Sequence, residues 1–264
     1  MGGQLAKIEA LWIGRHLGPI ARCCLYSFVM RGHEVTLHCY DSIEDLPDGV
    51  KTSDANLIIP EKEIVKHKAT GSYALFSDIF RYQLLQKRDN NTLYVDCDVY
   101  CLKPISIPAN GYLLGYEDDN AINGAVLALP QDSKILNALN LAAKDPKFIP
   151  PWYSRKRQFK LRCSKYLGFK RKIEDMAWGV IGPTAITYYF RYFQKLDKVS
   201  PIDLFYPIHY KKVRHYLLDE ELSVDDLVTH RTLCIHLYNE KLKGIDLDKI
   251  NRRSVLNRLL QNEV

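Results

Sequence analysis

The sequence has no long apolar run and no regular cysteine spacing, and each absence excludes a class of protein. Its longest apolar runs, such as residues 124–129, fall far short of the roughly 20 residues that a membrane-spanning helix needs. Residues 1–7 contain no apolar stretch that would serve as a signal peptide. Seven cysteines are present but none forms a Cys-x-x-Cys pair, so neither a disulfide framework nor a cysteine zinc site is indicated. We therefore expect a cytoplasmic protein with reduced thiols.

The overall composition is that of an ordinary globular protein. Of the 264 residues, 47% are hydrophobic and 26% are charged, which excludes a disordered chain. The length is sufficient to bury a core in one large α/β domain, or in one domain with a substantial insertion. No internal repeat and no low-complexity segment is present.

The net charge of +6 is unevenly distributed along the chain. Nine lysines and arginines lie between residues 155 and 172, and four aromatic residues, Tyr153, Phe159, Tyr166 and Phe169, are interleaved with them. Such a stretch suits an anionic surface, either lipid headgroups or a phosphorylated glycan. A solvated helix face or loop is the alternative. Nucleic acid is not expected as a partner, because no nucleic-acid motif accompanies the charge.

Apolar periodicity predicts an alternation of strands and helices. We expect strands at residues 8–13, 35–40, 92–95, 112–114, 124–129 and 233–237, and helices at 19–30, 73–86, 133–144, 184–193 and 247–261. Ser72 and Ser133 are expected to cap two of these helices. The opening strand–helix–strand order favours a mostly parallel sheet with helices on both faces. Residues 145–172 break the pattern and are interpreted as an insertion.

Asp96 and Asp98 form the central motif. They follow the apolar strand at 92–95, and carboxylates at i and i+2 of an extended segment point to the same side. At the carboxyl end of a buried strand they would face the crevice in which α/β proteins hold ligands. Two carboxylates this close need a cation, and oxygen ligands favour Mg²⁺ or Mn²⁺. The oxygens of a diphosphate would complete the coordination shell of that cation. A pair of surface-turn carboxylates is the alternative.

Segments on both sides of this motif resemble a known enzyme family. Ser-Asp-Ile-Phe-Arg-Tyr-Gln-Leu-Leu at 77–85, Tyr-Val-Asp-Cys-Asp at 94–98 and Leu-Lys-Pro at 102–104 are similar to the DXD-containing glycosyltransferase family 32. That family includes α-1,4-galactosyl- and mannosyltransferases and shares its core with the clostridial glucosylating toxins. The resemblance is strongest over residues 72–130 and thinner over 7–40 and 178–236.

The resemblance implies the GT-A fold, an α/β fold whose mostly parallel central sheet is flanked by helices. On this interpretation residues 1–264 form a single glycosyltransferase domain. Residues 1–130 would be the nucleotide-sugar-binding core, and 145–172 a basic insertion. Residues 173–264 would supply the acceptor side and a C-terminal helix.

The same resemblance implies roles for residues near the donor. Asp98 would bind the metal most directly, while Asp96 would help to hold it and reach the ribose. Asp78 and Arg81 would bind hydroxyls of the donor sugar, since positions i and i+3 of a helix share one face; an intrahelical salt bridge is the alternative. Trp12 would stack on the nucleotide base, with core packing as its alternative.

Further roles carry over to the later part of the chain. Asn123 would lie near the donor sugar, and Asp175 opposite it, although Glu174 could exchange roles with Asp175. His236 would be a third metal ligand, with a satisfied core histidine as the alternative. Typical family members have a Trp after this His, where the present sequence has Tyr238.

Together these expectations describe a retaining, metal-dependent glycosyltransferase. It would move a hexose, galactose or glucose, from a UDP-sugar to a hydroxyl of a glycan or lipid-linked glycan, in lipopolysaccharide or polysaccharide assembly. Residues 155–172 would give it peripheral contact with the inner face of the membrane.

Two other functions remain open at this stage. A haloacid-dehalogenase-type phosphatase also has Asp-x-Asp after an apolar strand, and Asp118 and Asp119 would be its late acidic pair. That motif normally opens the chain, whereas here about 90 residues precede it. A non-catalytic protein that binds anionic surfaces through residues 155–172 is the second alternative.

Overall fold

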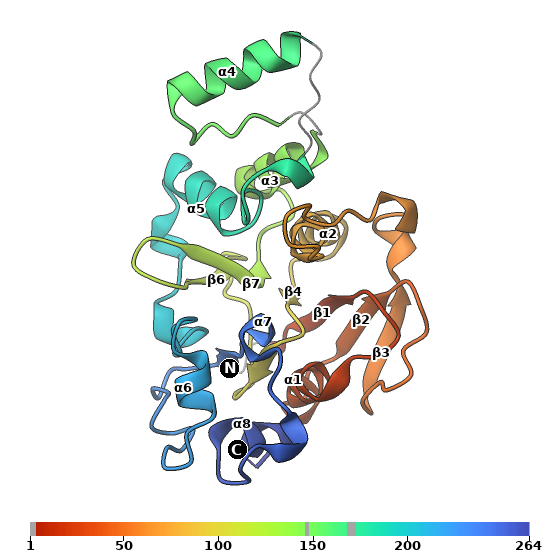
Figure 1. Cartoon of the computed structure of the whole chain (residues 1–264), viewed down its shortest axis with the longest axis vertical. Helices are drawn as coiled ribbons and strands as arrows, with labels where there is room; N and C mark the ends of the chain where they lie inside the picture. The colour runs from red at the N-terminus through yellow and green to blue at the C-terminus, as the bar shows by residue number, and fades with distance from the viewer. Residues whose placement is uncertain (1–3, 146–147, 168–172, 264) are drawn as a thin grey trace.

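Figure 1 shows the computed structural model of the protein, which describes residues 4–145, 148–167 and 173–263. Its centre is a six-stranded sheet in the order β3-β2-β1-β4-β7-β6. The strands are β1 (Lys7–Trp12), β2 (Val35–Cys39), β3 (Val50–Asp54), β4 (Thr92–Val95), β6 (Leu113–Tyr116) and β7 (Ile122–Ala128). The first four are parallel, and β7 runs antiparallel to both β4 and β6. The expected α/β fold with a mostly parallel central sheet is confirmed.

Helices cover both faces of this sheet, because successive strand residues point to opposite sides. In β4, Leu93 and Val95 pack in the same apolar cluster as α1 (Gly18–Met30), whereas Tyr94 packs in the cluster of three other helices. These are α2 (Ala74–Lys87), α3 (Lys134–Lys144) and α5 (Pro183–Tyr192). The all-buried β4 is therefore a central strand, and its carboxyl end lies between the two helical layers.

A second, two-stranded sheet lies beside the first. It pairs β5 (Val99–Cys101) with β8 (Cys234–His236) in antiparallel register, so that Val99 is opposite His236. This small sheet packs with α1 against three short helices of the carboxyl-terminal part: α6 (Val213–Leu217), α7 (Asn239–Leu242) and α8 (Val255–Leu260). Consequently a strand from the end of the chain lies next to the residues that follow β4.

The single C-terminal helix expected at 247–261 is wrong. The segment begins with a short 3-10 turn, becomes extended at Ile250, and forms a helix only from Val255, where the Ser254 side chain caps Asn257. Val255, Leu256 and Leu259 are buried against α1. The helix is short because its apolar residues fill one small gap, while the polar stretch before it follows the surface.

The two predicted helix caps differ in outcome. The Ser133 hydroxyl accepts the N–H of Leu136 at 3.0 Å and caps α3 as expected. The cap of α2 is Tyr73 instead of Ser72. Ser72 accepts the N–H of Ala74 at 3.1 Å and lies one residue before the capping position. The remaining 3-10 helices are η1 (Ala55–Leu57), η2 (Glu61–Glu63), η3 (Ile173–Asp175), η4 (Leu196–Lys198), η5 (Ile202–Leu204) and η6 (Leu247–Lys249).

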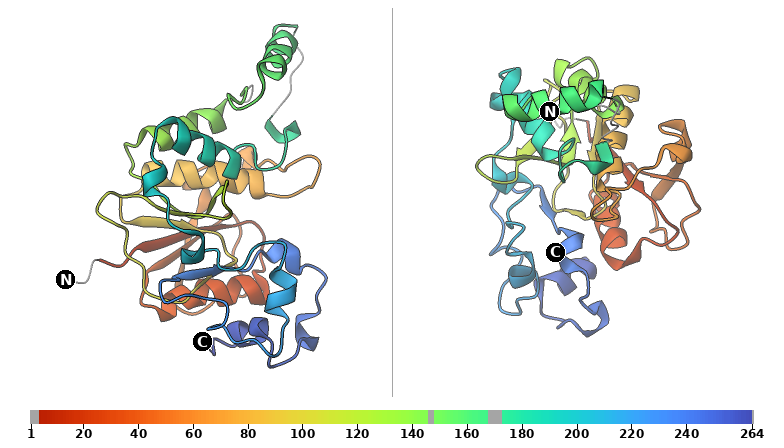
Figure 2. Two further views of the ribbon diagram at one scale, coloured as in Figure 1. Left: turned by 90° about the vertical axis from the view of Figure 1, so that its left-hand side faces the viewer. Right: turned by 45° about the horizontal axis from the view of Figure 1, so that its top comes forward.

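The basic segment contains one further helix, α4 (Arg155–Tyr166). It stands out from the end of the molecule formed by α3 and α5 (Figures 1 and 2). The cations at 170–172 lie outside the described residues. Among the helices that the structure describes, none is long and apolar enough to cross a membrane.

Candidate active site

Asp96 and Asp98 lie where β4 ends and β5 begins. The backbone N–H of Asp96 still donates to Ala125 of β7 at 2.8 Å, and its carbonyl then accepts the N–H of Val99 at 3.1 Å in a tight turn. Because β1 and β4 are parallel, this turn lies at the edge of the sheet where both strands end. The predicted end of the strand at Asp96 is therefore correct, and both carboxylates lie at the expected edge.

His236 joins the two aspartates. One ligand atom from each of Asp96, Asp98 and His236 lies within 4.8 Å of the others. The closest pair is His236 Nε2 and Asp98 Oδ1, 3.1 Å apart, although the residues are 138 positions apart in sequence. The β5–β8 pairing brings them together, so the structure assembles all three predicted metal ligands into one group that could hold a cation.

The chemistry of this group suits a divalent cation. Each carboxylate is already oriented by a fixed donor, since Asp98 Oδ2 accepts the Asn239 N–H at 2.8 Å and Asp96 Oδ1 accepts from Arg81 at 3.0 Å. Within the described part of the chain, Asp96 Oδ2 has no hydrogen-bond partner. Two carboxylates with one imidazole favour Mn²⁺ or Mg²⁺ over softer metals that prefer thiolates. The residues present therefore fit the implied metal.

Asp98 and His236 influence each other's protonation, because their side chains are within hydrogen-bond distance. Burial alone would raise the pKa of Asp98, but the positive His236 and its hydrogen bond, together with the Asn239 N–H, lower the pKa below its ordinary value. Burial likewise lowers the pKa of His236, and the negative charges of Asp98 and Asp96 outweigh it, so that the pKa is raised. The raised pKa of His236 reflects the negative charge of Asp98 and Asp96, which a bound cation would also stabilise.

Arg81 holds Asp96 in place from the neighbouring helix α2. Its side chain is only 5% exposed. Its Nη2 donates to Asp96 Oδ1 at 3.0 Å and to Ser77 Oγ at 2.9 Å, its Nε donates to the Ser77 carbonyl at 3.2 Å, and its Nη1 donates to the Gly124 carbonyl of β7. Tyr94 adds a hydroxyl that donates to Asp96 at 3.1 Å. The guanidinium therefore ties α2, β4 and β7 together at the site.

Asp78 lies one turn before Arg81 on the same face of α2, as expected. Its carboxylate is 3.4 Å from the Arg81 guanidinium and is almost fully buried. Burial raises the pKa of Asp78 to about 7, although the positive charge of Arg81 acts in the opposite direction. The backbone of Gly182 packs directly on this carboxylate, and a Cβ atom there would overlap it. The carboxyl group is thus confined in a narrow, weakly solvated place.

Trp12 and Asn123 lie at the same edge of the sheet. Trp12 is the last residue of β1, is half-buried, and donates from Nε1 to the His16 carbonyl at 3.0 Å. Asn123 lies in β7 beyond the part that pairs with β4, and its Oδ1 accepts the Ala125 N–H at 2.8 Å. Asn123 thus lies on the opposite side of β4 from Trp12, at the same edge of the sheet.

Asp175 and Glu174 occupy a different neighbourhood. Both lie in η3, next to the loop that precedes α2. Asp175 pairs with Lys68 at 2.8 Å, and the Glu174 carbonyl accepts the Lys68 N–H at 3.0 Å. The structure therefore does not place either carboxylate in the group formed by Asp96, Asp98 and His236.

Tyr238 and Asn239 are site residues whose roles the sequence did not reveal. Tyr238 has a left-handed backbone with φ of 49°, and its ring lies over the His236 imidazole with centroids 3.9 Å apart. The turn that it makes directs the Asn239 N–H to Asp98. Their departure from the family's Trp was the only signal in the sequence that this loop differs.

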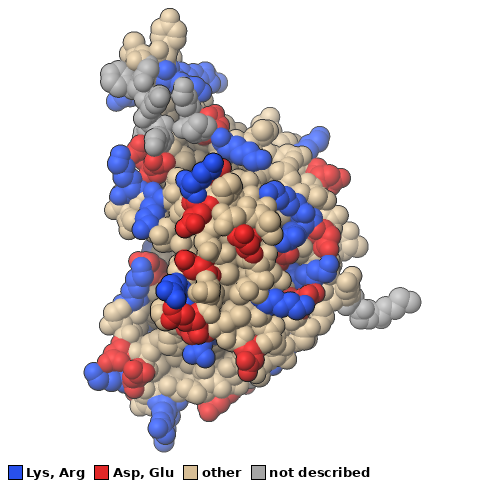
Figure 3. Space-filling view, turned by 90° about the vertical axis from the view of Figure 1, so that its right-hand side faces the viewer, with Lys and Arg blue, Asp and Glu red and all other residues tan. Residues whose placement is uncertain are grey.

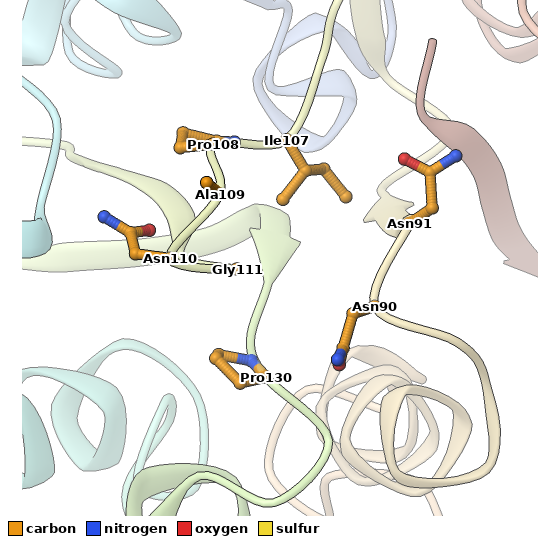
Figure 4. A pocket seen from close by; sticks show the side chains of 8 residues that line it. All are labelled: Asn90, Asn91, Ile107, Pro108, Ala109, Asn110, Gly111 and Pro130. Atoms are coloured by element: carbon orange, nitrogen blue, oxygen red, sulfur yellow. The ribbon is translucent and has the colours of Figure 1, made fainter. Parts of the chain in front are cut away.

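A surface pocket of about 420 Å³ lies away from this site (Figure 4). It is lined by the loops that precede β4 and β6 and by Pro130 after β7, which are the ends of these strands opposite to Asp96. Its lining contains Asn, Pro, Ala, Gly and Ile but no charged side chain. None of the predicted site residues contributes to it.

Comparison with known proteins agrees with the chemistry of the site. Residues 168–263 match the family model described as the alpha 1,4-glycosyltransferase conserved region. The match includes Asp175 and His236, whereas the predicted resemblance was strongest farther upstream. A search of curated proteins finds no match.

Two solved structures are similar to the chain. The PaToxG glycosyltransferase is 15% identical, covering 74% of this chain and 71% of its own, with a TM-score of 0.42. A transferase mutant with two Cys-to-Ser substitutions is 12% identical, covering 67% of this chain and 90% of its own, with a TM-score of 0.33. Scores this low carry no argument, so the assignment rests on the family model. Residues 168–263 therefore match the alpha 1,4-glycosyltransferase conserved region, as the resemblance implied, and this match indicates a glycosyltransferase.

Proposed function

We propose that this protein transfers a hexose from a UDP-sugar to a hydroxyl of a glycan, using a divalent cation and retaining the anomeric configuration. The observation that carries the proposal is the convergence of Asp96, Asp98 and His236 at the carboxyl end of β4, in a chain with a glycosyltransferase region. Galactose or glucose, and Mn²⁺ or Mg²⁺, are the expected sugar and cation.

Asp96, Asp98 and His236 would hold the cation. When bound, it would neutralise negative charge that develops on the leaving diphosphate. The remaining contacts keep these ligands rigid. Arg81 fixes one oxygen of Asp96, and the Asn239 N–H fixes one oxygen of Asp98. Such preorganisation is supported by the low exposure of Arg81 and His236.

The donor would lie along the edge formed by β1, β4 and β7. Trp12 would stack on the base and Asp96 would reach the ribose, since Trp12 ends β1 and Asp96 directly follows β4 at this edge. Asp78 and Asn123 would hydrogen-bond the sugar hydroxyls. Arg81 would act differently from the sequence-based expectation: four of its hydrogen bonds are already made within the protein, so we propose that it positions Asp96 and Asp78.

The acceptor side is proposed for residues 173–264 within a single domain of residues 1–264. Asp175 would act there, beside the loop at Lys68. Retention, an acceptor that is a glycan or lipid-linked glycan, and a place in lipopolysaccharide or polysaccharide assembly rest on the resemblance to family 32. We also propose a cytoplasmic location for the protein.

A panel of UDP- and GDP-sugars tests this function directly. With Mn²⁺ present and no acceptor, we expect slow release of hexose from one UDP-sugar and none after EDTA treatment. Release of phosphate from an aryl phosphate, without hydrolysis of any nucleotide-sugar, would favour the phosphatase instead. The structure gives that alternative little support, because Asp118 accepts the N–H groups of Asn120 and Ala121 at 2.8 Å and so serves a turn.

A further inference from the structure

Side chains of helix α4 contact the segment directly before it. Gln158 donates from its amide to the carbonyls of Pro151 and Tyr153, at 3.1 and 2.7 Å. Arg157 lies over the Tyr153 ring at 3.6 Å. None of the helix residues is buried. The helix therefore has no buried side, in agreement with its projection from the molecule (Figure 2).

One exposed face of α4 carries a stripe of alternating cationic and aromatic residues. Arg155, Phe159, Arg162 and Tyr166 follow one another at intervals of four, three and four residues, which aligns them on one face of a helix. We call these four residues the α4 stripe. All are exposed, and the two rings are 69% and 91% exposed. Rings this open to water contribute nothing to the core.

The charge of α4 is uncompensated. The helix contains no acidic residue, and Lys156, Lys160 and Lys165 add three more exposed cations to the stripe. Within the described ranges, no ion pair is recorded for any of these cations. Figure 3 shows lysines and arginines at this protruding end, whereas acidic and basic side chains are mixed over the body. The complementary partner is therefore an anionic one.

Further apolar side chains are exposed at the same end of the molecule. Leu141 of α3 is 72% exposed, Tyr192 of α5 is 64% exposed, and Leu167 directly after α4 is 69% exposed. These three helices lie together at one end (Figure 1). A surface that combines cations with exposed aromatic and aliphatic residues is typical of helices that lie at a membrane interface.

We propose that the α4 stripe binds the surface of an anionic phospholipid membrane, with Arg155 and Arg162 at the headgroups and Phe159 and Tyr166 inserted between them. A membrane is favoured over a nucleic acid because α4 protrudes. Single-stranded nucleic acids are bound in positively charged grooves, while a protruding helix reaches a flat surface without obstruction. The inference does not depend on the proposed reaction.

Cosedimentation with vesicles tests the inference. We expect the protein to sediment with vesicles of phosphatidylcholine mixed with phosphatidylserine, to stay in solution with phosphatidylcholine alone, and to be released by high salt. Each Lys or Arg near such a surface contributes about 1 kcal/mol, or about fivefold in partitioning, so Arg155→Gln with Arg162→Gln should weaken binding about 25-fold. Intermediate salt partly screens the attraction between charges. Under that condition, Phe159→Ala with Tyr166→Ala should weaken the binding that remains.

The matched control is Arg252→Gln with Arg253→Gln, which removes the same charge from exposed positions before α8. It should bind vesicles nearly as well as the wild type, since the screening length is about 8 Å at physiological salt. Equal weakening by both double variants would overturn the inference, because net charge alone would then explain binding. Failure of the wild type to sediment at low salt, or tighter binding to a single-stranded RNA homopolymer than to vesicles, would also overturn it. Unchanged circular dichroism of each variant shows that it remains folded.

Discussion

Arg81 is the residue on which the polar contacts beside the site converge. Its planar guanidinium reaches Ser77, Asp96 and Gly124 at once, which a lysine with a single ammonium group could not do. Each of these partners lies on a different element, α2, the end of β4 or β7. The residue therefore acts as a structural cross-link before it acts on any ligand.

Removal of this cross-link should cost stability. Arg81→Ala leaves the partly buried Asp96 and the buried Asp78 without their cation, so we expect the free energy of unfolding to fall by about 3 kcal/mol. Arg81→Lys keeps the charge but not the geometry and should restore only part of the loss. Urea denaturation measures both. Lys7→Ala is the control, since it breaks an exposed ion pair with Asp89 and should have little effect; an equally small effect of Arg81→Ala would refute the cross-link.

Asp78 should make stability depend on pH. Its pKa is raised by burial from an ordinary 3.8 to about 7 in the folded protein. Between these values the folded state keeps a proton that the unfolded state has lost, so stability is highest at low pH and falls as the pH rises through this window. A difference of about three pH units corresponds to roughly 4 kcal/mol.

Asp78→Asn removes this dependence, because an amide does not titrate. Unfolding curves recorded between pH 4 and pH 7 should therefore show a smaller loss of stability with rising pH in the variant than in the wild type. Parallel curves for the two proteins would show that Asp78 is ionised throughout and that its burial is compensated by other contacts.

Among the elements, the pairing of β5 with β8 has the largest effect on the site. Asp98 precedes β5 and His236 ends β8, so a shift of register by one residue would separate them. The chain then turns at Tyr238, whose left-handed backbone is unfavourable for a residue with a side chain. This strain is maintained by the packing of the Tyr238 ring on His236, which indicates a positioning role for the turn.

Substitutions of Tyr238 can distinguish the contribution of its ring from the contribution of its left-handed backbone. Tyr238→Phe keeps both the aromatic ring and the strained backbone, so it should bind Mn²⁺ like the wild type. Tyr238→Asn tolerates the left-handed conformation but loses the ring, and Tyr238→Ala loses the ring and keeps the strain. We expect the Mn²⁺ affinity, measured by electron paramagnetic resonance, to be lower in Tyr238→Asn than in the wild type and lower still in Tyr238→Ala. Equal affinity in all four proteins would mean that the loop does not position His236.

The elements that the sequence predicted are those with strong local signals. The strand at 92–95 is wholly apolar or β-branched, and the serine before α3 is a strong cap. By contrast, β3 is a polar edge strand with one buried residue, and β5 has three residues. Such strands form because neighbouring strands pair with them, so no local sequence pattern predicts them.

At the scale of the whole molecule, the sequence predicted which side chains lie close together better than it predicted their other contacts. Asp78 and Arg81 share a helix face and Asp98 meets His236, as expected. The sequence could not predict that the Gly124 carbonyl and Ser77 would occupy the Arg81 guanidinium, because backbone groups and distant strands carry no motif. Asp175 lies beside Lys68 for the same reason: tertiary packing of two loops decides its partner.

The central claim is that Asp96, Asp98 and His236 bind a divalent cation required for glycosyl transfer. Its most direct measurement compares Mn²⁺ binding and UDP-sugar hydrolysis in the wild type, Asp98→Asn and the control Asp132→Asn, which alters an exposed aspartate far along the chain from the motif. Asparagine keeps the shape of Asp98 and can still accept the Asn239 N–H, so the variant should remain folded. We predict that Asp98→Asn loses both Mn²⁺ binding and hydrolysis while Asp132→Asn keeps both. Near-native hydrolysis by Asp98→Asn, or a wild type that EDTA leaves fully active, would contradict the account.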